Sequence, residues 1–215
     1  MKPYYETENG KLYHGDCLEI MPQLEKVDLV LTDPPYGIEE KISRGGSSAT
    51  KSSVRFHQMY SENNMTWDKI ISNDIINLII CKSKNQIIFG GNYYNLGPCR
   101  CFIVYDKISM RIPTMSDCEY AWTSFDKPAK IFKNSNQKNR VHPTQKPVGL
   151  FKQILLKYSS ENQKILDPFL GSGTTAIAVE EIGQGRKWIG IEREEKYCEI
   201  AAKRIEQSTK QLKLF

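Results

Sequence analysis

Short segments rich in apolar residues alternate along the chain with segments whose apolar residues recur at helical spacing. Short continuous runs are typical of buried strands, and the 3.6-residue period is typical of helices packed on a sheet. The alternation predicts an α/β fold with a mostly parallel sheet and helices on both faces. The expected strands are 11–15, 27–32, 86–89, 101–107, 118–125, 164–167 and 187–192, and the expected helices are 17–24, 72–82, one with Pro147 in its first turn, 174–182 and 194–206.

One long segment, residues 38–66, shows neither period. Loops of this length within a compact domain are usually functional or disordered, so we expect a mobile active-site loop there. At 215 residues, the chain is long enough for one medium α/β domain, and we expect residues 1–215 to form a single domain. The stretch 106–141 is the candidate for a short target-recognition region.

The run Asp33-Pro34-Pro35-Tyr36 directly follows the apolar strand expected at 27–32. Two prolines make a rigid turn, so Asp33 and Tyr36 should be held in fixed directions at the end of that strand. The Asp33 carboxylate and the Pro34 carbonyl can each accept an N–H hydrogen bond, and Tyr36 can stack on a ring. An exocyclic amino group is a poor nucleophile because its lone pair is delocalised. The run therefore indicates a catalytic site, formed by all four residues, that holds the amino group of a flipped-out base.

A second run, from Asp167 to Thr175, combines the end of a strand with a glycine-rich turn and the start of a helix. Gly171-Ser172-Gly173 lets the backbone pass close to a ligand, and the helix N-terminus can face an anion such as the methionine carboxylate of S-adenosylmethionine. No Gly-Lys-Ser/Thr follows, which argues against a phosphate-binding loop of ATPases. Glu192 ends the next strand, where its carboxylate can accept hydrogen bonds from ribose hydroxyls.

Four motifs in one order carry a family resemblance: D-P-P-Y-G at 33–37, H-P-T-Q-K-P at 142–147, I-L-D-P-F-L-G-S-G-T-T at 165–175 and W-I-G-I-E at 188–192. The chain resembles the DNA amino-methyltransferases of the permuted, beta-type arrangement, in which the catalytic motif precedes the cofactor motif. The resemblance implies a Rossmann-like S-adenosylmethionine-dependent methyltransferase fold, with an antiparallel strand at one edge of the sheet.

The resemblance also implies which residues bind the cofactor. Asp16 would contact the adenine amino group of S-adenosylmethionine, although it could equally cap the helix expected to begin near Cys17. Thr144 and Lys146 would contact the methionine end. His142 is assigned a structural role, because methyl transfer from a sulfonium needs no base that titrates near neutral pH. The full candidate set is Asp16, Cys17, Asp33, Thr144, Lys146, Asp167, Pro168, Phe169, Gly171, Ser172, Gly173, Thr174 and Glu192.

Several alternatives remain at this point. Related cytosine amino-methyltransferases more often carry Ser in place of Asp33, so the motif favours adenine over cytosine. Enzymes that act on RNA amines often begin the motif with Asn and carry a separate RNA-binding module. A catalytically idle DNA-binding relative would be expected to have lost Asp33 or Tyr36. A nicotinamide-dependent oxidoreductase would need a catalytic constellation that nothing in the sequence indicates.

The net charge of +5 suits a polyanionic partner, and its distribution is more informative than its size. Residues 41–61 and 127–160 contain no acidic residue but many Lys and Arg. Without the motifs, these stretches would be interpreted as solvated basic faces. With them, we expect double-stranded DNA as substrate, and a second copy of the chain and a cognate restriction endonuclease are further candidate partners. The candidate DNA-binding residues are Lys41, Arg44, Lys51, Arg55, Lys130, Lys133, Lys138 and Arg140.

The six cysteines are scattered and include no C-x-x-C pair, which argues against a zinc site and a disulfide framework, so we expect no metal. The N-terminus lacks an apolar signal core, and no apolar run approaches membrane-spanning length. We therefore expect a reducing, cytoplasmic setting and no membrane partner.

Overall fold

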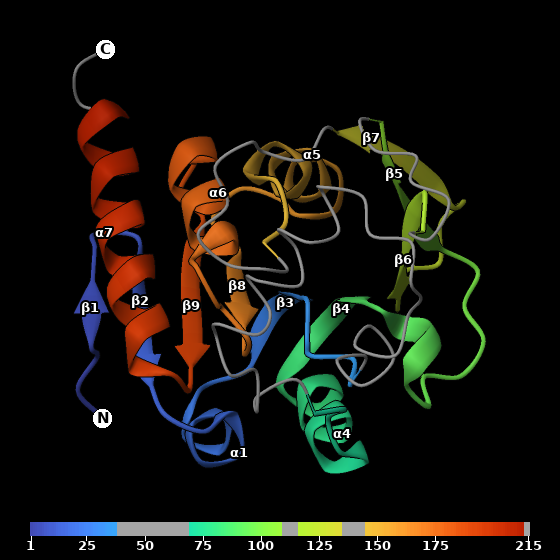
Figure 1. Cartoon of the computed structure of the whole chain (residues 1–215), viewed down its shortest axis with the longest axis horizontal. Coiled ribbons are helices and arrows are strands. Elements are labelled where there is room, and N and C mark those ends of the chain that lie inside the picture. Colours follow the sequence, from blue (N-terminus) through green and yellow to red (C-terminus); the bar gives the residue numbers. More distant parts are fainter. Residues whose placement is uncertain (38–68, 109–115, 135–144, 213–215) are drawn as a thin grey trace, which may run out of the picture.

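The computed structural model describes residues 1–37, 69–108, 116–134 and 145–212, which form one continuous nine-stranded sheet with helices on both faces (Figure 1). The candidate loop 38–66 lies outside the described residues. The strand order is β1-β2-β9-β8-β3-β4-β6-β5-β7. The strands are β1 (Tyr5–Glu6), β2 (Gly10–His14), β3 (Val27–Thr32), β4 (Ser83–Phe89), β5 (Phe102–Lys107), β6 (Cys118–Thr123), β7 (Lys130–Asn134), β8 (Lys164–Asp167) and β9 (Lys187–Glu192).

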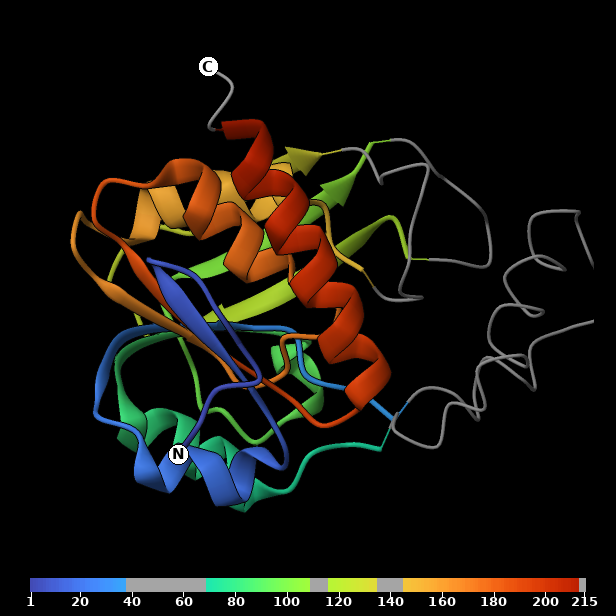
Figure 2. The same ribbon diagram turned by 90° about the vertical axis from the view of Figure 1, so that its left-hand side faces the viewer.

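The helices form two layers that enclose the sheet, as the turned view shows (Figure 2). One layer holds α1 (Cys17–Ile20) and α4 (Asn73–Lys82), and the other holds α5 (Val148–Tyr158), α6 (Thr174–Ile182) and α7 (Glu195–Leu212). Two buried clusters correspond to these layers. Alternate residues of β3 show the division, since Leu31 packs with α5 and α6 whereas Val30 packs with α4.

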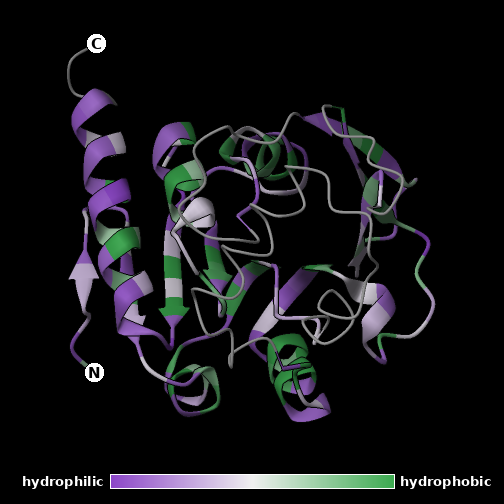
Figure 3. Ribbon diagram, viewed as in Figure 1, coloured by the Kyte–Doolittle hydropathy of each residue, from purple (hydrophilic) through white to green (hydrophobic). Residues whose placement is uncertain are grey.

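Helix α7 illustrates how the sequence pattern determines packing. Its buried residues Tyr197, Cys198, Ala201 and Ile205 follow an i, i+1, i+4, i+8 spacing, which places them on one face. The other residues of the helix are mostly hydrophilic (Figure 3). The helix therefore lies on the sheet with its polar side outward, and it extends beyond the end expected at residue 206.

The expected fold class is confirmed. Strands β2, β9, β8, β3 and β4 are parallel, and β1 is the antiparallel strand at one edge. A second reversed strand, β6, lies inside the sheet between β4 and β5. This reversal brings the first residues of β6 to the carboxyl end of β4, where the Gly90 amide donates to the Tyr120 carbonyl at 2.8 Å.

Some element boundaries differ from the expectation for local reasons. The helix expected at 17–24 divides into α1 and a 3₁₀ turn, Met21–Gln23, because Pro22 lacks the N–H that a continuous helix requires. Pro147 is the N-cap of α5 and not part of its first turn. Strand β6 ends at Thr123, two residues early. Neither β1 nor β7 was expected, and β7 lies within the basic stretch.

The candidate recognition region 106–141 is described only in part. Its described residues include β6 and β7, which both belong to the sheet.

Candidate active site

The two chemical motifs meet because their strands are neighbours. Strand β8 pairs in parallel with β3, so Asp167 and Asp33 follow adjacent strand ends at one edge of the sheet. The Thr32 hydroxyl donates to Asp167 Oδ1 at 2.8 Å and joins the two ends directly. In open α/β sheets, ligands bind at this carboxyl edge, which is where we place the site.

The glycine-rich turn after β8 exposes a helix N-terminus. Gly171 and Gly173 have positive φ angles of 53° and 87°. A Cβ at Gly173 would lie 3.2 Å from Ala201 of α7, so this position requires the smallest residue. Arg204 of α7 supports the turn from outside by donating to Ser172 Oγ at 2.8 Å. Sequence reasoning missed Arg204, because its place depends on how α7 packs.

Glu192, at the end of β9, holds the same turn. Its Oε2 accepts from the Gly171 amide at 2.9 Å, and its Oε1 accepts from the Glu194 amide at 2.8 Å. Burial raises the pKa of the Glu192 carboxyl. Each oxygen keeps a second lone pair, which suits a ribose hydroxyl. The helix N-terminus, the close-packed glycines and this carboxylate together fit S-adenosylmethionine.

Other candidate cofactor residues have structural contacts that the sequence did not specify. Asp167 is 4% exposed and accepts from the Thr32 and Thr175 hydroxyls and the Phe169 amide. Burial raises the pKa of Asp167 to about 6. The Asp167 carboxylate thus stabilises the turn through these hydrogen bonds, and the adjacent Pro168 is buried.

The segment around α1 and the one before α5 flank this turn. Asp16 accepts from the Leu18 amide at 2.8 Å, which is the capping contact considered as the alternative to cofactor binding. Cys17 is buried, and burial raises the pKa of its thiol to about 12, so the thiol is uncharged near neutral pH. Thr174 donates to the Lys146 carbonyl at 3.3 Å and connects α6 to the H-P-T-Q-K-P segment.

The Asp33 carboxylate, 15% exposed, is engaged at both oxygens. Lys146 Nζ lies 2.5 Å from Oδ2, and the Tyr36 hydroxyl donates to Oδ1. Burial raises the pKa of Asp33, and the positive charge of Lys146 opposes that shift. The Lys146 side chain therefore contacts the catalytic motif, although it was expected at the methionine end of the cofactor.

Glu119, on the reversed strand β6, completes a partly buried charge network that sequence reasoning missed. Lys146 Nζ lies 2.8 Å from Glu119 Oε2, and Lys107 Nζ lies 2.8 Å from Glu119 Oε1. Burial acts to raise the pKa of Glu119, but the charges of Lys146 and Lys107 hold it at about 2. Only the strand order brings these residues together, so no local pattern could have indicated them.

Aromatic side chains surround the motif. The ring of Tyr36 stacks on that of Tyr93, with centroids 5.2 Å apart and planes at 20°, and Tyr93 is 42% exposed. Gly90, with φ 64°, is required here because a Cβ would lie 2.1 Å from the Tyr36 ring. The Tyr94 hydroxyl donates to the Pro35 carbonyl at 3.0 Å and lies 3.3 Å from the Pro34 carbonyl.

Two of the candidate DNA-binding residues, Lys130 and Lys133, are exposed on β7. Strand β7 pairs in parallel with β5, and Lys133 lies beside Asp106 near the carboxyl edge of the sheet. The remaining candidates lie outside the described residues, as do Thr144 and His142. These DNA-binding candidates are Lys41, Arg44, Lys51, Arg55, Lys138 and Arg140.

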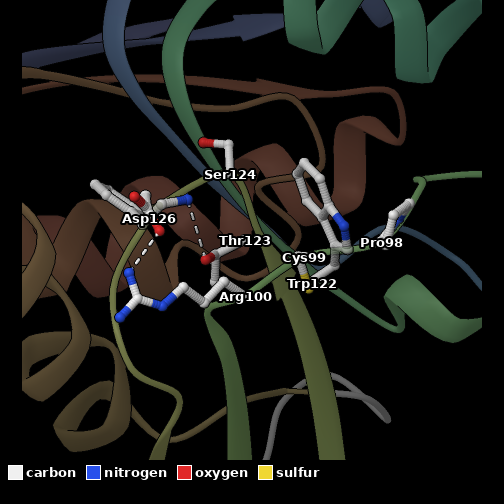
Figure 4. A pocket seen from close by; sticks show the side chains of 8 residues that line it. Pro98, Cys99, Arg100, Trp122, Thr123, Ser124 and Asp126 are labelled. Atoms are coloured by element: carbon white, nitrogen blue, oxygen red, sulfur yellow. Dashed lines mark hydrogen bonds and ion pairs between the residues drawn. The ribbon is translucent and has the colours of Figure 1, made fainter.

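A separate cavity of about 320 Å³ lies toward the other end of β6, lined by Pro98, Arg100, Trp122 and Asp126 among others (Figure 4). Arg100 and Asp126 form an ion pair of 2.8 Å at its rim, and both are exposed. Within the described ranges, no His, Cys, Asp and Glu side chains cluster as a metal site would require, and no helix has the length and apolarity needed to cross a membrane.

Comparison with known proteins agrees with this geometry. The model of the N6/N4 methyltransferase family, described as DNA methylase, matches residues 58–203. Type II methyltransferase M2.LlaDCHI of Lactococcus lactis subsp. cremoris is 30% identical, covering 95% of this chain and 92% of its own. M.HinfI of Haemophilus influenzae is 44% identical, covering 90% of this chain and 67% of its own.

Solved structures share the fold. The complex of M1.HpyAVI with S-adenosylmethionine has a TM-score of 0.58 at 24% identity, covering 91% of this chain and 98% of that chain. The cytosine-N4-specific PvuII DNA methyltransferase has a TM-score of 0.61 at 18% identity, covering 98% and 94%.

Together with the family match, the Rossmann-like fold and its carboxyl-edge site define an S-adenosylmethionine-dependent methyltransferase. The chain belongs to the N6/N4 DNA methylase family, which confirms the expected family, cofactor and reaction class. It is a DNA amino-methyltransferase.

Proposed function

We propose that this chain methylates the exocyclic amino group of adenine in a flipped-out nucleotide of double-stranded DNA. One observation carries the proposal: the hydrogen bond between Thr32 and Asp167 joins the strand end that bears the catalytic motif to the strand end that bears the cofactor turn. A base held at Asp33 and a methyl donor held at Gly171–Gly173 would then share one crevice.

In this proposal the Asp33 carboxylate and the Pro34 carbonyl each accept a hydrogen bond from one N–H of the target amino group, which localises the lone pair on the reacting nitrogen. Tyr36 stacks on the base, and Pro35 keeps the turn rigid. S-adenosylmethionine supplies the methyl group. The N-terminus of α6 and Glu192 hold its carboxylate and ribose, with Asp16, Cys17, Pro168 and Phe169 at the borders of the crevice.

The choice of adenine rests on the first residue of the motif and on the aromatic surface. Asp33 occupies the position at which related cytosine enzymes more often carry Ser. Tyr36 and the half-exposed Tyr93 are the aromatic rings beside the motif on which a purine could stack. Cytosine remains the alternative substrate, and PvuII methyltransferase shows that a cytosine-N4-specific enzyme shares this fold.

The proposal extends to the rest of the chain. We assign residues 1–215 to a single domain and target recognition to residues 106–141, whereas the candidate loop 38–66 lies outside the described residues. Phosphates would contact Lys130 and Lys133, together with the six basic candidates outside the described residues. A second copy of the chain and a cognate restriction endonuclease are the proposed protein partners.

The decisive experiment identifies the methylated base. The protein is incubated with mixed-sequence duplex DNA and labelled S-adenosylmethionine, the DNA is digested, and the nucleosides are separated. Label on N6-methyladenine supports the proposal, whereas label only on N4-methylcytosine would contradict the choice of base. Absence of label together with measurable binding of S-adenosylmethionine and DNA would indicate a catalytically idle relative.

A further inference from the structure

Lys146 is placed between two carboxylates that come from different parts of the chain. We propose that Glu119 is a positioning residue for methyl transfer, which shares the Lys146 ammonium with Asp33 and so leaves the Asp33 carboxylate able to accept a hydrogen bond from the amino group of the target base. This inference rests on the catalytic role proposed for Asp33.

The geometry of the network supports this role. Lys146 Nζ lies 2.5 Å from Asp33 Oδ2 and 2.8 Å from Glu119 Oε2, and the Lys146 side chain is 7% exposed. Glu119 Oε2 and Lys146 Nζ form an ion pair, so Glu119 acts on Lys146 through its charge. The Lys146 ammonium is therefore shared between two anions.

Lys107 fixes Glu119 in this place. Its Nζ lies 2.8 Å from Glu119 Oε1, and the two side chains are 20% and 23% exposed. Lys107 ends β5 and Glu119 lies near the start of β6, so the antiparallel pairing of these strands sets their contact. The group of Asp33, Glu119, Lys146 and Lys107 has no net charge, which reduces the cost of burying it.

The chemical consequence follows from competition for one carboxylate. An ammonium group paired with Asp33 alone would polarise its oxygens and make them weaker acceptors for a neutral amine. Because Glu119 also pairs with the Lys146 ammonium, that ammonium polarises the Asp33 oxygens less strongly. The ring centroids of Tyr36 and Phe89 lie 5.8 Å and 5.3 Å from Lys146 Nζ, so aromatic faces flank the ammonium.

The test uses Glu119→Gln, which keeps the shape of the side chain and removes its charge. We expect the single-turnover rate of methyl transfer to fall roughly 10- to 100-fold, the scale for misplacing a reacting group, while affinities for S-adenosylmethionine and DNA stay within about twofold. The acidic limb of the pH–rate profile should move to lower pH, because the Glu119 charge raises the pKa of Asp33 while Lys146 and the Tyr36 hydroxyl lower it.

Two further variants separate positioning from general loss of structure. Glu181→Gln removes a comparable carboxylate, paired with Lys152 at 2.9 Å between α5 and α6, and should leave the rate unchanged. In a Lys146→Met background, Glu119→Gln should cost no additional rate, because Glu119 acts through Lys146. Should Glu119→Gln not fold, Glu119→Asp retains the charge at a greater distance and should give a smaller rate loss.

An unchanged methyl-transfer rate in Glu119→Gln would overturn the inference. So would a double variant whose rate loss equals the sum of the two single losses, if the acidic limb of the pH–rate profile also stays in place. Activity of Asp33→Ala near the wild-type level would instead contradict the proposed function. Inactive Asp33→Ala with fully active Glu119→Gln would contradict only the role of Glu119.

Discussion

Lys146 Nζ lies 2.5 Å from Asp33 Oδ2, so the proposed catalytic carboxylate is an ion-paired group before any base is bound. The Tyr36 hydroxyl donates to the other oxygen. Each oxygen keeps a second lone pair, and one of them can receive the amino hydrogen of the base. The proposed acceptor is therefore already oriented by two donors from different segments of the chain.

Replacing this carboxylate tests its role. Asp33→Ala should lower the single-turnover rate by roughly a hundredfold or more, the scale for losing one group that stabilises developing charge. Affinity for S-adenosylmethionine, measured by calorimetry, should change much less, because the cofactor turn is held by Glu192 and Asp167. Methylation by Asp33→Ala at the wild-type rate would exclude Asp33 from catalysis.

Glu192 offers a test of the cofactor site. Glu192→Ala removes the acceptor of the Gly171 amide together with the proposed ribose contacts, about 1–3 kcal/mol for hydrogen bonds of ordinary strength. Affinity for S-adenosylmethionine should weaken between several-fold and a hundredfold. Glu195→Ala is the matched control, since this carboxylate is exposed at the start of α7. Equal affinities of the two variants would remove Glu192 from the site.

Much of this site was predictable from sequence because the decisive signals are local. The strands 27–32, 164–167 and 187–192 and the helix 174–182 were predicted with their observed limits, since each is an apolar segment bounded by a motif. Strand β7 was missed because it is short, lies at the sheet edge and carries exposed Lys130 and Ile131.

The contacts that join distant segments could not be predicted in this way. Glu119 meets Lys146 only because β6 runs against β4, and that reversal is a property of the whole sheet. Arg204 reaches Ser172 only because α7 packs over α6. Local sequence patterns therefore indicated the groups that carry the chemistry, whereas the groups that orient them depend on topology.

The stacked pair of Tyr36 and Tyr93 predicts a second aromatic contact to the target base. A base that stacks on the covered face of Tyr36 must displace the half-exposed Tyr93 ring, which can then pack on the base. Base–aromatic stacking contributes about 1–3 kcal/mol, so Tyr93→Ala should weaken binding of the target duplex roughly 5- to 150-fold. Tyr93→Phe keeps the ring and should bind normally. Equal binding by both variants would show that Tyr93 does not contact the base.

Asp167 predicts a measurable pH dependence of stability. Burial raises its pKa in the folded chain to about 6, against an ordinary value of 3.8, so the folded state retains a proton that the unfolded chain has lost between these values. This contribution to stability is complete below about pH 3.8 and is lost as the pH rises through 6, a change on the order of 3 kcal/mol at about 1.4 kcal/mol per pKa unit. Asp167→Asn cannot ionise, so its free energy of unfolding, measured by urea denaturation, should fall less than that of the wild type between pH 4 and 7.

Asp28→Asn is the control, because hydrogen bonds from Lys84 and the Lys164 amide lower the pKa of Asp28 and confine its effect to the region below pH 4. Parallel stability curves for Asp167→Asn and the wild type across pH 4–7 would show that Asp167 is already ionised in the folded protein.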